Sequence, residues 1–356
     1  MRLNILHITP DFNYACGRSY YVFLLLKYLK KEKHNVMLLT NGGDSLDRLE
    51  DEGIRYLIVK DLHSKNIIPF IKNVNYIKSI IRENNISIVH THHRFSEFLA
   101  VQAERLTRGK KVKTILTSLS LVGTRYNIEY KSDKIIAVSH AIKDMLTRRF
   151  KVAERRITVI PNFTDTDELY PFSKRSRAMP RKSGRTFNIL AIGRFHHEKN
   201  FEILLKALNL LKDKKLRLVL IGEGDMQDDY RTYMHRHHLN VEIVEPQKNL
   251  VDYYRWADLC VLPSSRDPFP NFMIQSGLHK KPFIGSNVDG IAELISDRKN
   301  GLLFKSGNFH DLAEKIELFK TNSYLAQRCA SRLHNEVIKH YTQEFIIPKI
   351  EKLYRN

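Results

Sequence analysis

The sequence predicts an α/β protein built from two doubly wound domains. Three observations predict it: the chain of 356 residues is longer than one typical domain, short β-branched runs alternate with amphipathic helical patterns, and the alternation restarts after a basic segment at residues 173–186. Strand–helix alternation is typical of parallel sheets covered by helices on both faces. The composition, 42% hydrophobic and 28% charged, excludes a disordered, collagen-like or coiled-coil chain.

The first domain is predicted to span residues 1–172. Its strands are expected where aliphatic and β-branched residues form short runs, at residues 3–8, 35–39, 55–59, 86–90, 114–119 and 134–138. Its helices are expected where apolar residues recur at spacings of three and four, at residues 19–32, 68–84, 96–108 and 141–150. Residues 173–186, rich in Ser, Arg, Pro and Gly, are predicted to form a basic linker.

The second domain is predicted to span residues 187–340. The expected strands are residues 187–193, 216–224, 241–245, 259–264 and 282–286, and the expected helices include residues 200–212 and 226–237. Residues 341–356 form a terminal helix that is expected to pack back on the first domain, with Pro348 at its start or at a kink. Ligands of such sheets bind beyond the carboxyl ends of the strands, so two domains facing each other across a cleft should carry their chemistry there.

Two cations follow the first strand of the second domain. Arg194 comes directly after Gly193 at the strand end, and Lys199 stands five residues later, beside the expected helix start at Asn200. Both side chains and the helix amino terminus could point at one place, which would suit a diphosphate. The alternative is two solvated loop cations.

A second polar group lies in the segment DPFPNFMIQSGLHKKPFIGS. Asp267 begins a turn restricted by two prolines, Asn271 is expected to cap the following helix, and Gln275 lies one turn into it. A loop carboxylate and a helix amide could hold two hydroxyl-bearing parts of one ligand. The alternative is a turn residue and an exposed helix position.

A third group, VHTHHR, ends a strand of the first domain. It holds His90, His92 and His93, followed by Arg94. Three neighbouring histidines suggest a metal site, but His93 should point away from the other two and no carboxylate stands at ligand spacing, so we expect no metal. A hydrogen-bonded strand histidine is the simpler alternative.

These segments, taken in order, resemble the retaining glycosyltransferases with two Rossmann-like domains (GT-B architecture, family 4 or group 1 type). GRFHHEKNF is similar to their "G-R-x-x-x-x-K" segment, and the segment from Asp267 to Ile295 is similar to their two glutamates separated by seven residues, with the "GxPVI" and "GGxxE" patterns that follow. SHAIKDML with ITVIPN and ILHITPDFNYACGRSYY are similar to the end and the opening of their first domain. The likeness covers nearly the whole chain.

The resemblance implies roles for individual residues. Arg194 and Lys199 would bind the donor diphosphate, and Gly17 would let the backbone approach it, with Cys16 in place of the family's first glycine. Asp267 stands where the first glutamate is expected, near the transferred sugar. Gln275 replaces the second glutamate, which holds the ribose hydroxyls. The implied donor-binding residues are Gly17, Arg194, Lys199, Asp267, Asn271, Gln275 and Glu293.

The remaining implied roles concern catalysis and the acceptor. The catalytic set would be Asp267, His92, Arg194 and Lys199, with His92 and His90 on the acceptor side. Asp289, Gly290 and Glu293 match "GGxxE" with its first glycine changed. The donor would be a nucleotide sugar, with UDP expected, and cations rather than a divalent metal would neutralise the diphosphate, so no cofactor is expected.

Charge indicates where the acceptor comes from. The chain carries a formal net charge of +20, of which +10 lies in residues 1–170 and +4 in residues 187–356. Two basic segments, residues 105–113 and 148–156, follow helices of the first domain, near the aromatic residues Tyr20, Tyr21, Phe23 and Phe150. This charge predicts salt-sensitive binding to anionic lipid, without an apolar anchor, at the inner face of the cytoplasmic membrane. A solvated lysine-rich surface is the alternative.

The sequence therefore predicts a cytoplasmic, membrane-associated glycosyltransferase that extends a lipid-linked or lipopolysaccharide-type glycan. No apolar run reaches 18 residues, and the three cysteines lack metal or redox spacing. One rival is a catalytically weakened nucleotide-sugar-binding partner of another transferase, since both glutamate positions have changed. The other is a nucleic-acid binder, which the lack of interleaved aromatics and of known motifs disfavours.

Overall fold

The computed structural model describes residues 2–107, 109, 111–124, 129–169 and 186–356. The predicted linker at residues 173–186 therefore lies, except for Thr186, outside the described residues. The chain forms two compact units: residues 1–162 with 343–356, and residues 163–342. The first unit ends at Asn162 rather than at the expected residue 172, because Phe163 and the short stretch after it belong with the second unit.

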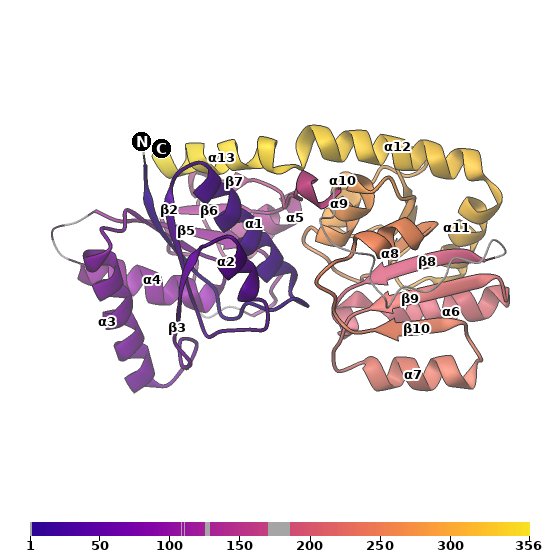
Figure 1. Cartoon of the computed structure of the whole chain (residues 1–356), viewed down its shortest axis with the longest axis horizontal. Coiled ribbons are helices and arrows are strands. Elements are labelled where there is room, and N and C mark those ends of the chain that lie inside the picture. Colours follow the sequence, from indigo (N-terminus) through magenta and orange to yellow (C-terminus); the bar gives the residue numbers. More distant parts are fainter. Residues whose placement is uncertain (1, 108, 110, 125–128, 170–185) are drawn as a thin grey trace. The chain divides into compact units, whose positions relative to one another are not determined.

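The first unit contains a parallel sheet of seven strands in the order β3-β2-β1-β4-β5-β6-β7 (Figure 1). The strands are β1 (Asn4–Ile8), β2 (Asn35–Thr40), β3 (Arg55–Ile58), β4 (Ile88–Thr91), β5 (Lys113–Ser118), β6 (Lys134–Ala137) and β7 (Ile157–Val159). Strands β1, β3, β4 and β6 are shorter than their predicted runs, β5 is as long as its run, and β2 extends one residue beyond its run. The side chains of the central strands β1, β4 and β5 are almost continuously buried, as expected of a sheet covered on both faces.

Helices connect these strands. They are α1 (Gly17–Lys31), α2 (Asp47–Asp51), α3 (Ile67–Glu83), α4 (Arg94–Leu106), α5 (His140–Asp144) and, from the end of the chain, α13 (Gln343–Arg355). The α5 helix continues into a single π turn at Met145–Arg149. The helix α3 packs beside α4, and its apolar residues Val74, Ile77 and Ile81 enter the same core as Leu6, Ile8 and Val89 of the sheet.

The second unit contains a parallel sheet of six strands in the order β10-β9-β8-β11-β12-β13. The strands are β8 (Phe187–Ile192), β9 (Leu216–Ile221), β10 (Val241–Val244), β11 (Leu259–Leu262), β12 (Phe283–Ser286) and β13 (Leu302–Phe304). The helices are α6 (Phe201–Leu211), α7 (Gln227–Arg236), α8 (Val251–Trp256), α9 (Asn271–Leu278), α10 (Asp289–Leu294), α11 (Phe309–Thr321) and α12 (Ser323–His340).

The order of the strands fixes where each unit can bind a ligand. The strand order reverses between β1 and β4 in the first sheet, and between β8 and β11 in the second. Loops that leave the carboxyl ends of such a strand pair diverge to opposite faces and open a crevice, the usual ligand site of doubly wound sheets. The histidine segment begins in β4 and continues into the loop after it, while Arg194 follows β8 and Asp267 follows β11, so all three lie at switch points.

The terminal helix α13 is part of the first unit. It packs against α1 and is held by polar contacts to three separate places: Glu351 bonds His34 at 2.7 Å, the Tyr354 hydroxyl bonds His90 at 2.7 Å, and Lys113 donates to the Leu353 carbonyl at 2.6 Å. Pro348 lies inside this helix and does not end it. Among the described residues, no helix is long and apolar enough to cross a bilayer.

Candidate functional site

The centre of the second unit's site is an ion pair between two loops. Lys199 Nζ lies 2.5 Å from Asp267 Oδ2, and the Ser264 hydroxyl lies 3.3 Å from the same oxygen. Asp267 is only 3% exposed. Lys199 ends a short 3₁₀ turn, His197–Lys199, and its aliphatic stem passes over Gly193. Two residues that are 68 positions apart in the sequence thus meet at the β8–β11 switch point.

Backbone hydrogen bonds hold these loops together. Ser265 N–H donates to the Glu198 carbonyl at 2.8 Å, which joins the loop after β11 to the loop after β8. Gly290 N–H donates to the Asp267 carbonyl at 3.0 Å, and Asp267 N–H donates to Asp289 Oδ2 at 3.1 Å. These two bonds join the loop after β11 to α10. Burial raises the pKa of Asp289. The changed residue of the "GGxxE" pattern thus receives a bond from the backbone of the candidate catalytic aspartate.

Glycines permit this close packing, and only one of them was singled out from the sequence. A Cβ on Gly290 would lie 1.9 Å from the Pro268 carbonyl oxygen. A Cβ on Gly222 would lie 2.0 Å from the Gly193 carbonyl oxygen, and one on Gly224 would lie 2.5 Å from that of Phe195. Gly222 and Gly224 also have φ near +150°, which favours glycine. In the sequence, the only indication of Gly222 and Gly224 is that they end the strand run LRLVLIGEG.

The helix α9 begins differently from the prediction. Its N-cap is Pro270, and Asn271 is its first residue, so the prediction that Asn271 caps the helix is wrong. Proline fixes φ close to the −72° seen at this cap, which explains why the chain can enter the helix without a side-chain cap. Gln275 is buried, not an exposed helix position, and its Oε1 accepts a hydrogen bond from the Tyr254 hydroxyl at 3.1 Å.

Two further members of the implied donor set lie at the surface of the second unit. Arg194 is exposed two residues after the end of β8, and Glu293 is exposed on α10. The structure thus brings Lys199 and Asp267 into contact, while Arg194 and Glu293 remain accessible from solvent.

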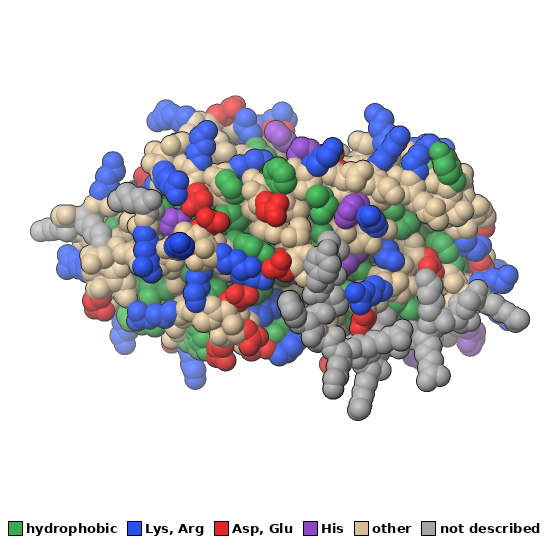
Figure 2. Space-filling model, turned by 45° about the horizontal axis from the view of Figure 1, so that its top comes forward, with side chains coloured by type: hydrophobic (Ala, Val, Ile, Leu, Met, Phe, Trp, Pro, Cys, Tyr) green, Lys and Arg blue, Asp and Glu red, His purple; other side chains and the backbone are tan. Residues whose placement is uncertain are grey.

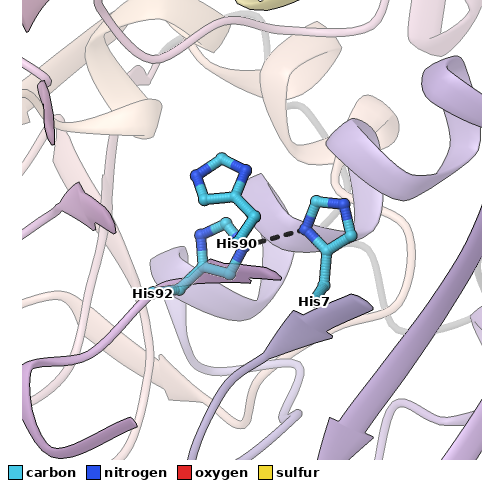
Figure 3. A group of neighbouring side chains, drawn as sticks. All are labelled: His7, His90 and His92. Carbon is cyan, nitrogen blue, oxygen red and sulfur yellow. Dashed lines mark hydrogen bonds between the residues drawn. The ribbon is translucent and has the colours of Figure 1, made fainter. Parts of the chain in front are cut away.

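In the first unit, three histidine rings gather at the ends of β1 and β4 (Figure 3). They are His90 and His92, which the sequence singled out, and His7, which it did not. His7 and His90 are direct partners across the β1–β4 ladder, and that register could not be known from the local sequence. His93 instead lies beside His63, with ring centroids 5.4 Å apart, as its expected opposite direction implied.

The ring nitrogens of this cluster take part in hydrogen bonds. His90 uses both ring nitrogens, Nδ1 to the Tyr354 hydroxyl and Nε2 to the Thr117 hydroxyl, each at 2.7 Å. His7 Nδ1 and His92 Nε2 lie 3.0 Å apart and bond each other. A metal ion held by His7, His90 and His92 would have to replace these hydrogen bonds.

The His7–His92 bond leaves two buried atoms unpaired. His7 Nε2 and His92 Nδ1 have no hydrogen-bond partner among the described residues. If His7 Nδ1 donates to His92 Nε2, then His92 Nδ1 carries an unpaired N–H and His7 Nε2 an unpaired lone pair. If His92 Nε2 donates instead, His7 Nε2 carries the unpaired N–H and His92 Nδ1 the unpaired lone pair. In both tautomers one donor and one acceptor remain. A buried unpaired polar atom costs about 1–3 kcal/mol, so a water or a substrate hydroxyl at His92 would relieve a cost already present.

Acid should destabilise the first unit through these histidines. Burial lowers the pKa of His7 to about 3, below the value near 6.5 of an unfolded chain. The stabilisation is therefore fully present above about pH 6.5 and is lost as the pH falls from there toward 3. Between pH 7 and pH 5, His7 alone should lower the free energy of unfolding by about 2 kcal/mol. Urea unfolding at both pH values tests this: the fall should be smaller in His7→Gln, and equal falls in both proteins would contradict it.

The opening loop completes the carboxyl edge of the first sheet. Gly17 is the exposed first residue of α1, and Cys16 is its N-cap. Arg18 Nη2 donates to both carboxylate oxygens of Asp11, at 2.8 and 2.7 Å. A Cβ on Gly43 would lie 2.1 Å from the Phe12 carbonyl oxygen, so this glycine lets the loop after β2 support the opening loop.

The two basic segments are partly structural. Arg156 donates to the carbonyl oxygens of Tyr130 and Ser132, and Lys113 binds α13 as described above. Phe150 and Tyr21 are buried, so neither forms part of an exposed aromatic patch. On the face shown in Figure 2, Lys and Arg side chains are scattered and have Asp and Glu among them.

Two family models match the chain. The model described as Glycosyltransferase Family 4 matches residues 17–168, and the model described as Glycosyl transferases group 1 matches residues 173–335. Two doubly wound units with polar groups at their switch points are the architecture of GT-B glycosyltransferases. The two matches together span most of the chain, which belongs to this glycosyltransferase family and is an enzyme of that class.

Similar proteins include enzymes of known substrates. The chain is 22% identical to the N,N'-diacetylbacillosaminyl-diphospho-undecaprenol alpha-1,3-N-acetylgalactosaminyltransferase of Campylobacter jejuni, over 95% of this chain and 96% of that protein. It is 20% identical to the UDP-Gal:alpha-D-GlcNAc-diphosphoundecaprenol alpha-1,3-galactosyltransferase of Escherichia coli, over 92% and 90%. Its fold matches that of Anabaena HepE in complex with UDP and glucose, with a TM-score of 0.86, 15% identity and full coverage of both chains.

Proposed function

We propose that this glycosyltransferase moves a sugar from a UDP-sugar to a lipid-linked or lipopolysaccharide-type saccharide, with retention at the anomeric carbon and without a divalent cation. The contact between Lys199 and Asp267 carries the proposal, because it places a cation and a carboxylate side by side at a switch point. An ammonium group suits the departing diphosphate, and a carboxylate suits a sugar hydroxyl or developing positive charge at the anomeric carbon.

The proposed chemistry rests on charge stabilisation. As the bond between sugar and diphosphate breaks, negative charge grows on the leaving oxygen, and Lys199 with the exposed Arg194 would neutralise it. These two cations would do the work that a divalent metal does in other transferases. Asp267 would orient the transferred sugar, held in place by Lys199, Ser264 and its backbone bond to Asp289.

The histidine cluster supports an acceptor side on the first unit. His90 has both ring nitrogens engaged, so its proposed part is to support the site, whereas His92 keeps one buried nitrogen without a partner. We assign contact with a substrate hydroxyl to His92. The lipid-linked class of acceptor is inferred from the named substrates of the Campylobacter jejuni and Escherichia coli relatives.

Gln275→Glu should tighten UDP binding by up to about 1 kcal/mol. A carboxylate offers more accepting capacity to ribose hydroxyls than an amide does, and the Tyr254 hydroxyl, already bonded to Gln275 Oε1, would help to stabilise its charge. Titration calorimetry with UDP measures the change. Weaker binding in the Glu variant would mean that Gln275 donates through its amide or faces something other than ribose.

A thermal-shift screen of nucleotide sugars tests the donor. A ligand present at 100 times its dissociation constant should stabilise the protein by about 2.7 kcal/mol. UDP-sugars should raise the melting temperature more than ADP- or GDP-sugars, with and without EDTA. A stabilising effect confined to another nucleotide, or one lost in EDTA, would overturn the proposed donor or the proposed metal independence.

The alternative function is that of a catalytically weakened, nucleotide-sugar-binding partner of another transferase. The change at both glutamate positions of the family, to Asp267 and Gln275, suggests this alternative. The close pairing of Asp267 with Lys199 favours an active enzyme, because a protein that had lost catalysis would not need a buried carboxylate in contact with its phosphate-binding lysine.

A further inference from the structure

The start of α3 exposes an apolar surface. The side chains of Ile67, Ile68 and Ile71 are 68%, 64% and 52% exposed, and they lie within the first turn and a half of this helix. Three isoleucines exposed so closely together are unusual for a soluble surface, where single apolar side chains are normal and contiguous apolar patches mark interaction sites. We call these three residues the α3 patch.

Packing on the other side of the helix keeps the α3 patch in solvent. Phe70 stacks on Phe98 of α4, with ring centroids 5.1 Å apart, and also contacts Phe95. The Asn73 side-chain amide donates to the Asp61 carbonyl at 2.7 Å, which fixes the preceding loop. Because Phe70 and Asn73 hold the inward face of α3, the helix cannot turn its isoleucines into the core of this unit.

The charges around the patch indicate its occupant. Lys65 and Lys72 are exposed on either side of the α3 patch, and Lys60 is exposed in the loop before it. None of the three lysines forms an ion pair with the residues that the structure describes. Apolar side chains surrounded by lysines suit an anionic bilayer, where the isoleucines enter the acyl boundary and the ammonium groups meet phosphates. A second copy would instead bring like charges together.

The patch is also connected to the candidate acceptor site. The same loop contains His63, whose Nε2 lies 2.7 Å from the Ser96 hydroxyl and whose ring lies against His93, the residue after His92. The α3 patch therefore begins four residues beyond a histidine that contacts the carboxyl edge of the first sheet. A lipid-linked saccharide held at the bilayer would have its head group near that edge.

We propose that the α3 patch, with Lys65 and Lys72, is the membrane-docking surface of this enzyme. This rests on the proposed lipid-linked acceptor and deepens it by naming the surface that meets the lipid. It also changes the expectation drawn from charge alone, which was salt-sensitive binding without an apolar anchor. Binding should have two parts: a lysine part, screened over about 3 Å at 1 M salt, and an isoleucine part that salt does not remove.

Vesicle sedimentation of the full chain tests the docking surface without any need for catalysis. The triple variant Ile67→Ser/Ile68→Ser/Ile71→Ser should bind vesicles of phosphatidylglycerol and phosphatidylcholine at least about tenfold more weakly. The matched control Leu106→Ser/Leu210→Ser/Tyr324→Ser removes three apolar side chains that are 51%, 44% and 73% exposed on other helices, and it should bind like the unmodified protein. Equal losses in both variants, or none in either, would overturn the proposal.

Two further measurements separate the possible failures. In 1 M salt the unmodified protein should retain binding that the triple isoleucine variant lacks, whereas Lys65→Gln/Lys72→Gln should lose binding mainly at low salt. Complete loss of binding by the unmodified protein in 1 M salt would overturn the isoleucine part, and a dimer that the triple variant abolishes would assign the patch to a second copy. The rise in melting temperature caused by UDP is measured in parallel, and it should be absent only if the proposed donor is wrong.

Discussion

Arg194→Ala should reduce sugar transfer by a factor of hundreds to a thousand while leaving the fold unchanged. Removing a charge positioned at a developing anion typically costs about 3–4 kcal/mol of transition-state stabilisation. The Arg194 side chain is exposed in the loop after β8, so its loss disturbs no packing. Steady-state transfer measured with a UDP-sugar gives the effect, and urea unfolding checks the fold.

Lys199→Ala should cause a loss of the same order, for a partly different reason. It removes the second cation of the proposed diphosphate site and also leaves the buried Asp267 carboxylate without its partner at 2.5 Å. Some loss of stability is therefore expected in this variant and not in Arg194→Ala. Lys206→Ala is the matched control, because Lys206 also pairs with a carboxylate, Glu202 on α6, but away from the switch point. Near-normal transfer by both Arg194→Ala and Lys199→Ala would refute the diphosphate assignment.

Gly290→Ala should destabilise the second unit and disturb its candidate site. Its Cβ would lie 1.9 Å from the Pro268 carbonyl oxygen, a backbone atom that cannot rotate away. Relief requires the turn after Asp267 to move, and such overpacking costs about 1–3 kcal/mol or more. Because the same turn holds Asp267, UDP stabilisation and transfer should fall together with the free energy of unfolding.

Gly123→Ala is the control for this prediction. A Cβ at Gly123 meets no atom of the described residues within 4 Å, and its φ is not in the left-handed region. This variant should change stability by no more than a few tenths of a kcal/mol. If Gly290→Ala matched it in stability and in UDP binding, the turn would not be the rigid support described above.

Local patterns predicted much of the fold and of the second unit's site. All predicted strands of the first half lie in the parallel sheet, since buried parallel strands are marked by short apolar runs. The sequence also predicted that Lys199 and Asp267 lie in loops that follow strands, although it did not predict their direct contact. Such features depend on one segment at a time.

What the sequence could not supply depends on register and backbone approach. His7 reads as an ordinary strand residue until the β1–β4 register sets it opposite His90. Gly222 and Gly224 appear as a strand end until the neighbouring loop passes within 2.0–2.5 Å of where their side chains would be. The apolar residues of α3 have the spacing of an amphipathic helix. Only the packing of Phe70 shows which of them, those of the α3 patch, stay exposed to solvent.

The position of α13 in the first unit has a consequence for biosynthesis. During translation, residues 1–162 emerge first, but their unit is complete only when residues 343–356 arrive, after the whole of residues 163–342. At about 5–20 residues per second that interval lasts roughly 10–40 s. During this interval His34 lacks its later hydrogen-bond partner Glu351, and His90 lacks its later partner Tyr354. A nascent chain would hold an unfinished first unit while its second unit folds, and a fragment ending at Asn162 should need the 343–356 peptide in trans to reach full stability.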